Sequence, residues 1–138
     1  MENILLIFVL LTMAIIFAYI LYTNGFLVYK AKAALFYKGS VPFGKTKNCM
    51  KAKFSSCNGM TKRVICLEKG KKYQFTFSKS MTKGTVYVEI QGNKGEIILK
   101  LDDETPTATI VVEEGKRYHA VTKFVKADGE YILCWDTK

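Results

Sequence analysis

The sequence is poor in the residues that most enzyme and metal sites need. It has one histidine, His119, and four cysteines that are separated by seven, eight and sixty-seven residues. Zinc sites usually take cysteines in pairs two to four residues apart, so these spacings argue against zinc. No serine or cysteine stands at motif spacing from His119, and the sequence has no glycine-rich phosphate loop. We therefore expect a non-enzymatic chain without cofactor or metal, and a histidine that is exposed or hydrogen-bonded.

A second absence is that of charge in Ile4–Tyr22, a run of nineteen residues that also lacks proline and glycine. As a helix rising about 1.5 Å per residue, this run spans roughly 28 Å, close to the hydrocarbon thickness of a bilayer. The three residues before it carry no lysine or arginine, and the uncharged run continues to Tyr29, whereas a secretory signal peptide is basic first and shorter. Residues 1–29 are therefore predicted to be an uncleaved, single-pass signal-anchor helix, with a cleaved signal peptide as the alternative.

Acidic residues are missing from residues 30–63, which carry nine basic ones. These are Lys30, Lys32, Lys38, Lys45, Lys47, Lys51, Lys53, Lys62 and Arg63. We expect residues 30–62 to form a basic juxtamembrane linker, either a solvated spacer or a contact to a polyanion such as anionic lipid or a cell-wall polymer. Residues 64–138 are nearly balanced, with twelve basic and eleven acidic residues. A nucleic-acid partner is not expected, because this part shows no basic face or binding motif.

From residue 63 onward, apolar and polar residues alternate, which is the period of a half-buried β-strand. Seven strands are expected at 63–67, 73–77, 85–91, 96–101, 107–112, 117–124 and 130–135. Their spacing is typical of an antiparallel β-sandwich or a small barrel, so residues 63–138 are predicted to be an all-β domain. Its inward-facing residues are expected to be Phe75, Phe77, Val88, Leu99, Val111, Tyr118, Leu133 and Trp135.

The four cysteines allow three pairings. Cys66 lies in the first expected strand and Cys134 in the last, and these strands are neighbours in many sandwiches, so the two are expected to bond. Cys49 and Cys57 would then close a local loop. Free structural thiols are the alternative.

Two further groups of residues are candidate binding sites. Asp102-Asp103-Glu104 could supply calcium ligands, but no EF-hand pattern accompanies them, and a solvated acidic turn is favoured. Tyr131 and Trp135 share a strand face with Leu133, which favours the core. If exposed beside Tyr87, they would instead form an aromatic platform for a ligand.

Three runs of the β region carry a resemblance: KGTVYVEIQGNKGEIILKL, TATIVVEEGKRYHAV and KADGEYILCW. They are similar to small bacterial surface modules of the pre-peptidase C-terminal type, over residues 68–136. The resemblance implies a β-sandwich that is accessory, non-catalytic and located outside the cytoplasm. The four cysteines and the basic stretch depart from the usual pattern of those modules.

Together these features predict a membrane-anchored binding or structural module at the cell surface. Its partners would be the bilayer and another envelope protein or a wall polymer. The alternative is a cytoplasm-facing single-pass protein whose β domain senses a ligand or docks a partner, with its linker on anionic lipid. The lysines after the apolar run favour the alternative, since positive charge tends to stay in the cytoplasm. Four cysteines, an even number, favour the surface.

Overall fold

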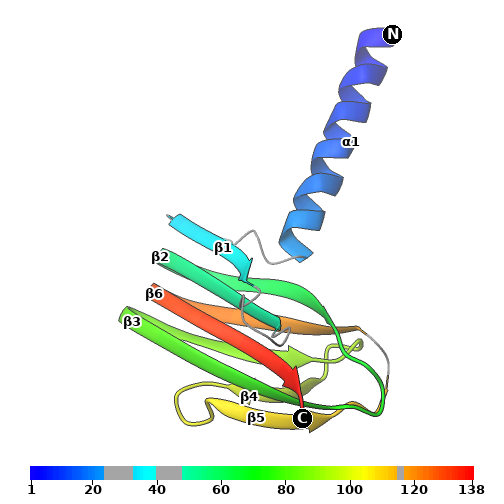
Figure 1. Ribbon diagram of the computed structural model, residues 1–138. Coiled ribbons are helices and arrows are strands. Elements are labelled where there is room, and N and C mark those ends of the chain that lie inside the picture. Colours follow the sequence, from blue (N-terminus) through cyan, green and yellow to red (C-terminus); the bar gives the residue numbers. More distant parts are fainter. Residues whose placement is uncertain (24–32, 40–47, 115–116) are drawn as a thin grey trace.

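The computed structural model describes residues 1–23, 33–39, 48–114 and 117–138 (Figure 1). One helix and six strands follow in the order α1 (Glu2–Thr23), β1 (Ala33–Gly39), β2 (Asn48–Cys66), β3 (Lys72–Gln91), β4 (Ile97–Leu101), β5 (Thr107–Val111) and β6 (Arg117–Thr137). All strand pairs are antiparallel, in the order β1-β2-β6-β3-β4, and β5 also pairs with β3. The prediction of an antiparallel, mostly β fold behind an apolar helix is confirmed.

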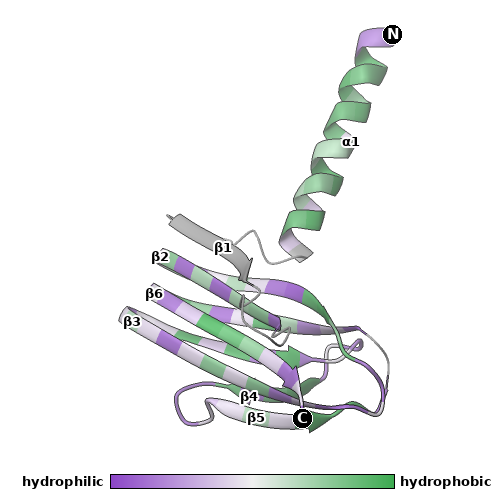
Figure 2. Ribbon diagram, in the orientation of Figure 1, coloured by the Kyte–Doolittle hydropathy of each residue, from purple (hydrophilic) through white to green (hydrophobic). Residues whose placement is uncertain are grey.

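The helix α1 is apolar on every side, as its nearly uniform colour in Figure 2 shows. Residues 2–20 are exposed, so no part of the fold covers this stretch. In the described part of the chain, Glu2–Tyr22 is the one helix long and apolar enough to cross a membrane. A membrane anchor and a signal sequence share these properties.

The strands β2, β3 and β6 are long because each one bends and continues. β3 joins two of the expected strands, 73–77 and 85–91, and β6 joins 117–124 and 130–135. Shifts of register interrupt both ladders at the bends. The expectation of seven separate strands was therefore wrong, because residues read as turns are β-bulges, which bend a strand without ending it.

The bends of the three long strands lie together and are tied by polar contacts. The Asp128 carboxylate accepts a hydrogen bond from the Ser56 backbone N–H, and the Thr82 hydroxyl donates to the Asp128 carbonyl oxygen at 3.2 Å. Gly84 and Gly129 adopt positive φ angles of 69° and 151°, which side chains rarely tolerate. The bends fold the sheet over, so that its two halves face each other (Figure 1).

Aromatic side chains fill the space between these halves. Tyr131 is completely buried, and its ring lies 5.9–6.2 Å from those of Phe54, Phe77 and Phe124. Its hydroxyl shares a 3.0 Å hydrogen bond with that of Thr122, and burial raises the pKa of Tyr131 to about 12. The core therefore contains one satisfied phenol.

Most of the residues expected to face inward are buried or packed against the core. Val111 is the exception, with 60% of its surface exposed. The core side of β5 is formed by Ala108 and Ile110, and the chain after it adds the buried Val112. The predicted inward face of this strand was displaced by one residue. Because side chains alternate between the two faces of a strand, this displacement exchanges the inward and outward residues, so the prediction for Val111 was wrong.

The expected linker is also wrong in part, because residues 33–39 and 48–62 belong to strands β1 and β2. Met50, Ala52 and Phe54 are buried in β2 at alternate positions. Lys51 and Lys53 lie between them and point to the other face, so residues 50–54 alternate between buried and outward-facing positions as in an ordinary strand. β2 is therefore an interior strand, paired with β1 and β6.

Candidate functional site

The cysteines pair differently from the prediction. Cys49 lies opposite Cys134 in the β2–β6 ladder, and the two are joined by a disulfide, whereas Cys57 and Cys66 are free thiols. Cys66 lies opposite Arg117 at the start of β6. Because β6 bends between Arg117 and Cys134, Cys134 lies in the other half of the sheet, away from Cys66. Burial raises the pKa of the Cys57 thiol to about 11, so this thiol is poorly reactive.

The basic residues expected to bind a polyanion do not form one described patch. Lys30, Lys32, Lys45 and Lys47 lie outside the described residues, and Lys38 lies in β1. The Lys51 and Lys53 ammonium groups lie 3.9 and 3.8 Å from the Glu130 carboxylate. Burial lowers the pKa of Arg63, which is half-buried in β2. Polyanion binding by these residues remains a prediction.

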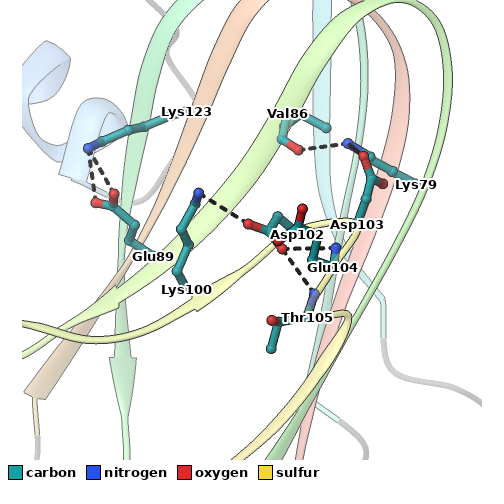
Figure 3. Close-up of polar contacts among 9 residues, drawn as sticks. All are labelled: Lys79, Val86, Glu89, Lys100, Asp102, Asp103, Glu104, Thr105 and Lys123. Atoms are coloured by element: carbon teal, nitrogen blue, oxygen red, sulfur yellow. Dashed lines mark hydrogen bonds and ion pairs between the residues drawn. The ribbon is translucent and has the colours of Figure 1, made fainter.

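The acidic loop between β4 and β5 is held by its own contacts (Figure 3). The Asp102 carboxylate accepts hydrogen bonds from the backbone N–H groups of Glu104 and Thr105 at 3.1 and 3.0 Å, and it pairs with Lys100 at 3.1 Å. The Asp103 carboxylate pairs with Lys79 at 2.9 Å. In the described residues, no group of three acidic, histidine or cysteine side chains could hold a metal ion.

Tyr87 was considered as part of an aromatic platform, but Tyr131 and Trp135 lie in the core, away from it. The Lys100 and Lys123 ammonium groups lie 4.7 and 5.8 Å from the centre of the Tyr87 ring. Lys123 also pairs with the buried Glu89 carboxylate at 3.0 Å (Figure 3). The Tyr87 ring is therefore flanked by cations that already have partners, and it lines a second hollow of about 400 Å³ together with Met60 and Phe124.

A hollow with a volume of about 610 Å³ lies between the edge strands β4 and β5. We call it the edge groove. Its lining residues are Gly92, Asn93, Lys94, Glu96, Ile98, Ile110, Val111, Glu113, Glu114, Arg117 and Tyr118. They come from both sheet halves: β5 belongs to one, and the β3–β4 hairpin and the start of β6 belong to the other. A volume of this size is typical of ligand pockets.

The edge groove combines apolar walls with carboxylates. Ile98 and Val111 are 40% and 60% exposed. No ion pair joins Glu96, Glu113 or Glu114 to another residue in the described part of the chain. These features suit a ligand with apolar and cationic groups.

Tyr118 links the edge groove to the core. Its hydroxyl donates a 2.6 Å hydrogen bond to the Glu114 carbonyl oxygen. The pKa of Tyr118 is raised, first by burial and then by the negative charge of Glu96, Glu114 and Glu113. The tyrosine thus stays a neutral hydrogen-bond donor that fixes the chain just after β5.

His119 follows Tyr118 on the opposite face of β6 and is half-buried. Its pKa is lowered, mainly by burial and next by the nearby charge of Lys62, while a hydrogen bond with the Gly92 backbone opposes the shift. As expected, this histidine is a hydrogen-bonded strand residue. It does not line the edge groove.

The sequence prediction did not identify the edge groove. Glu96 begins the expected strand 96–101, and Glu113 and Glu114 lie between the expected strands 107–112 and 117–124. Each turn balances its glutamates with basic residues, Lys94 in one and Lys116 with Arg117 in the other, so the sequence carried no signal of an acidic site. Bringing the two turns together required knowledge of the bends in β3 and β6.

No protein-family model matches the sequence, and no curated protein matches it. Among solved structures, PliG, a periplasmic inhibitor of g-type lysozyme from Aeromonas hydrophila, is similar at a TM-score of 0.53 and 12% identity, over 71% of this chain and 93% of that one. Accessory secretory protein 1, 2 and 3 of Streptococcus pneumoniae is similar at 0.47 and 9% identity, over 85% and 95% of the two chains. The carbohydrate-binding module CBM6cm-2 of Cellvibrio mixtus lichenase 5A reaches 0.45 and 6%, over 85% and 94%.

Of these three likenesses, the one to PliG has a score that indicates a shared fold, and at 12% identity it indicates nothing about activity. The resemblance to pre-peptidase C-terminal modules is not accompanied by a family match. The coarser expectation of a β module agrees with the likeness of fold to PliG.

Proposed function

We propose that this chain is a membrane-anchored, non-catalytic binding module whose β domain lies outside the cytoplasm. α1 would be its single-pass anchor, and the folded-over sheet would act as a β-sandwich. The edge groove would be its binding surface. The observation that carries the proposal is the disulfide between Cys49 and Cys134.

The disulfide supports a location outside the cytoplasm because reducing conditions inside most cells keep thiols free. Cys49 and Cys134 are 85 residues apart in the sequence, so the bond closes a long loop. In the chain-entropy model, such a loop contributes about 4–5 kcal/mol to stability. A fold that depends on this bond would be stable only where the bond can form.

The alternative, a cytoplasm-facing domain, is favoured by the lysines that follow α1. Lys30, Lys32 and Lys38 carry that argument, because they lie within about 15–20 residues of the end of α1. Lys51, Lys53, Lys62 and Arg63 belong to β2. Topology depends mainly on charges within about 15–20 residues of the membrane segment, and a folded domain crosses largely regardless of charge.

The position of the edge groove supports a role toward the aqueous phase. In the half of the sheet that contains β1, the strand order is β1-β2-β6-β3-β5. β1 begins ten residues after α1 ends. With strands about 4.8 Å apart, β5 lies about 19 Å from β1 across the sheet. The anchor would thus hold β1 near the bilayer and leave the edge groove free for a partner.

The free thiol of Cys66 tests the location. It is exposed, whereas Cys57 is buried and Cys49 and Cys134 are bonded. In intact cells, a membrane-impermeant maleimide should label the chain, and a Cys66→Ser variant should abolish the labelling. Labelling only after permeabilisation would overturn the proposal in favour of the cytoplasmic alternative.

A further inference from the structure

β5 has one paired edge. It pairs with β3 from Thr107 to Val111, and no described strand pairs with its other edge. The backbone N–H of Phe77 donates to the Pro106 carbonyl, and that of Val112 donates to the Lys71 carbonyl. In an antiparallel ladder the hydrogen-bonded pairs alternate, so Ala108 and Ile110 also point toward β3.

The same alternation points the backbone N–H and carbonyl groups of Thr107, Thr109 and Val111 to the free side. Natural proteins usually protect such an edge with lysine, proline or a bulge. β5 has none of these, since its residues are Thr-Ala-Thr-Ile-Val and its register with β3 is regular. This edge can therefore accept another strand.

The space beside the free edge is the edge groove. A strand added to β5 would direct alternate side chains inward, between the two halves of the sheet, toward Ile98 and Ile110. About 610 Å³ is available there. Small or medium apolar side chains would fit this space beside Ile110.

Charge complementarity identifies the remaining side chains of such a strand. Glu113 and Glu114 lie just beyond β5, and Glu96 lies just before β4, all three without an ion partner in the described part of the chain. Lys94 and Arg117 also line the groove and offset part of this charge. A lysine or arginine at the end of the incoming strand would lie beside the carboxylates of Glu113 and Glu114, whereas the Glu96 carboxylate also accepts a hydrogen bond from the Lys94 backbone N–H.

We propose that β5 binds an extended, cationic segment of a partner protein as an additional strand, with alternate apolar side chains in the edge groove. Backbone hydrogen bonds to Thr107, Thr109 and Val111 provide affinity, and the carboxylates of Glu96, Glu113 and Glu114 select basic residues. This inference rests on the proposed binding function and names its partner chemistry.

A second anchored copy is a poor occupant, although β1 also has a free edge. Pairing β1 of one copy with β5 of another would place a strand tied closely to the bilayer beside one that lies about 19 Å farther away. Two copies in the same membrane would therefore have to tilt strongly.

The test uses the full chain in nanodiscs of uncharged lipid, so that a cationic probe does not bind the bilayer. The probe is fluorescent Lys-Val-Lys-Val-Lys-Val-Lys, and its anisotropy reports binding. We expect saturable binding that weakens as salt rises. The matched probe Glu-Val-Glu-Val-Glu-Val-Glu should bind at least about tenfold more weakly.

Two variants and one modified probe test the geometry. Thr109→Pro removes a donor that points to the free side and should weaken binding at least about tenfold. Glu113→Gln with Glu114→Gln should weaken it about fivefold or more, whereas the exposed Glu104→Gln in the β4–β5 loop should leave it unchanged. A probe that is N-methylated at alternate residues should lose binding to the unaltered chain, which covers the case that Thr109→Pro fails to fold.

The inference would be overturned by a probe that does not bind or that binds equally well to Thr109→Pro. Association of the chain with itself through β5, in place of probe binding, would also overturn it. Labelling of Cys66 in intact cells is independent of these results. A labelled Cys66 with no probe binding would reject the strand addition and leave the proposed location standing.

Discussion

Gly84 lies against the carbonyl oxygen of Lys126 where β3 and β6 bend together, and a Cβ at Gly84 would overlap that oxygen. The backbone on the other side of the contact is also strained, since Lys126 has a φ of 45°. The close approach joins the two bends that turn one sheet into two facing halves.

Replacing Gly84 by alanine should therefore destabilise the chain by more than about 2 kcal/mol, because the Cβ meets backbone and the φ is positive. Gly70→Ala is the control: Gly70 has a φ of 81° but open space around its Cβ position. It should cost about 1 kcal/mol. Thermal or denaturant unfolding of both variants in the same detergent measures the difference, and equal losses would argue against a closely packed bend.

The ion pair between Glu89 and Lys123 should behave as a buried pair. The Glu89 side chain is 8% exposed and that of Lys123 is 34% exposed. Lys123→Met leaves a buried carboxylate without its cation and should cost about 1–3 kcal/mol. Adding Glu89→Gln should recover part of that loss.

The control pair is Lys71–Glu68, whose side chains are 50% and 67% exposed. Lys71→Met should change the free energy of unfolding far less than Lys123→Met does, because solvent screens the exposed pair. A double-mutant cycle with similar coupling for both pairs would contradict the assigned burial.

His119 should make stability depend on pH in one direction. Its pKa in the folded chain lies below the usual value of 6.5, because burial and Lys62 disfavour the charged ring. The unfolded chain therefore binds more protons between the two pKa values, and stability falls as pH drops through 6.5 toward the folded pKa. In His119→Gln, the free energy of unfolding should depend less on pH between pH 7 and about 5. A stability that rises on acidification and loses this rise in the variant would contradict the assignment.

The direction of backbone groups in β5 predicts opposite outcomes for adjacent prolines. Thr109→Pro removes an N–H that points to the free edge and should change stability by less than about 1 kcal/mol. Ile110→Pro removes an N–H that bonds to β3 and withdraws an apolar side chain, so it should cost about 3 kcal/mol or more. Denaturant or thermal unfolding of the two variants measures the difference. A greater loss of stability in Thr109→Pro than in Ile110→Pro would show that the N–H of Thr109, and not that of Ile110, bonds to β3.

The alternation of residues from 63 onward was sufficient to predict the β class and most of the core. It did not predict continuous strands. Lys126-Ala127-Asp128-Gly129 has the composition of a turn, yet in the structure it bends β6 within one strand. Local composition does not distinguish a bulge from a chain reversal, because glycine and aspartate favour both.

β2 and the disulfide were missed for a related reason. Lysines at alternate positions concealed the buried Met50, Ala52 and Phe54, so the stretch was interpreted as a linker. Without β2 in the sheet, Cys49 had no strand partner, and Cys66 took its place in the predicted pairing. The edge groove depends on two turns about twenty residues apart, and only the folded sheet brings them together.

The claim that the β domain lies outside the cytoplasm depends most directly on the redox state of Cys49 and Cys134 in living cells. Cells are quenched in acid, which traps thiols as they are, and the denatured chain is alkylated and weighed. The account predicts two alkylated cysteines without reductant and four after reduction, with Cys49 and Cys134 gaining the label. Four alkylated cysteines without reductant would contradict it.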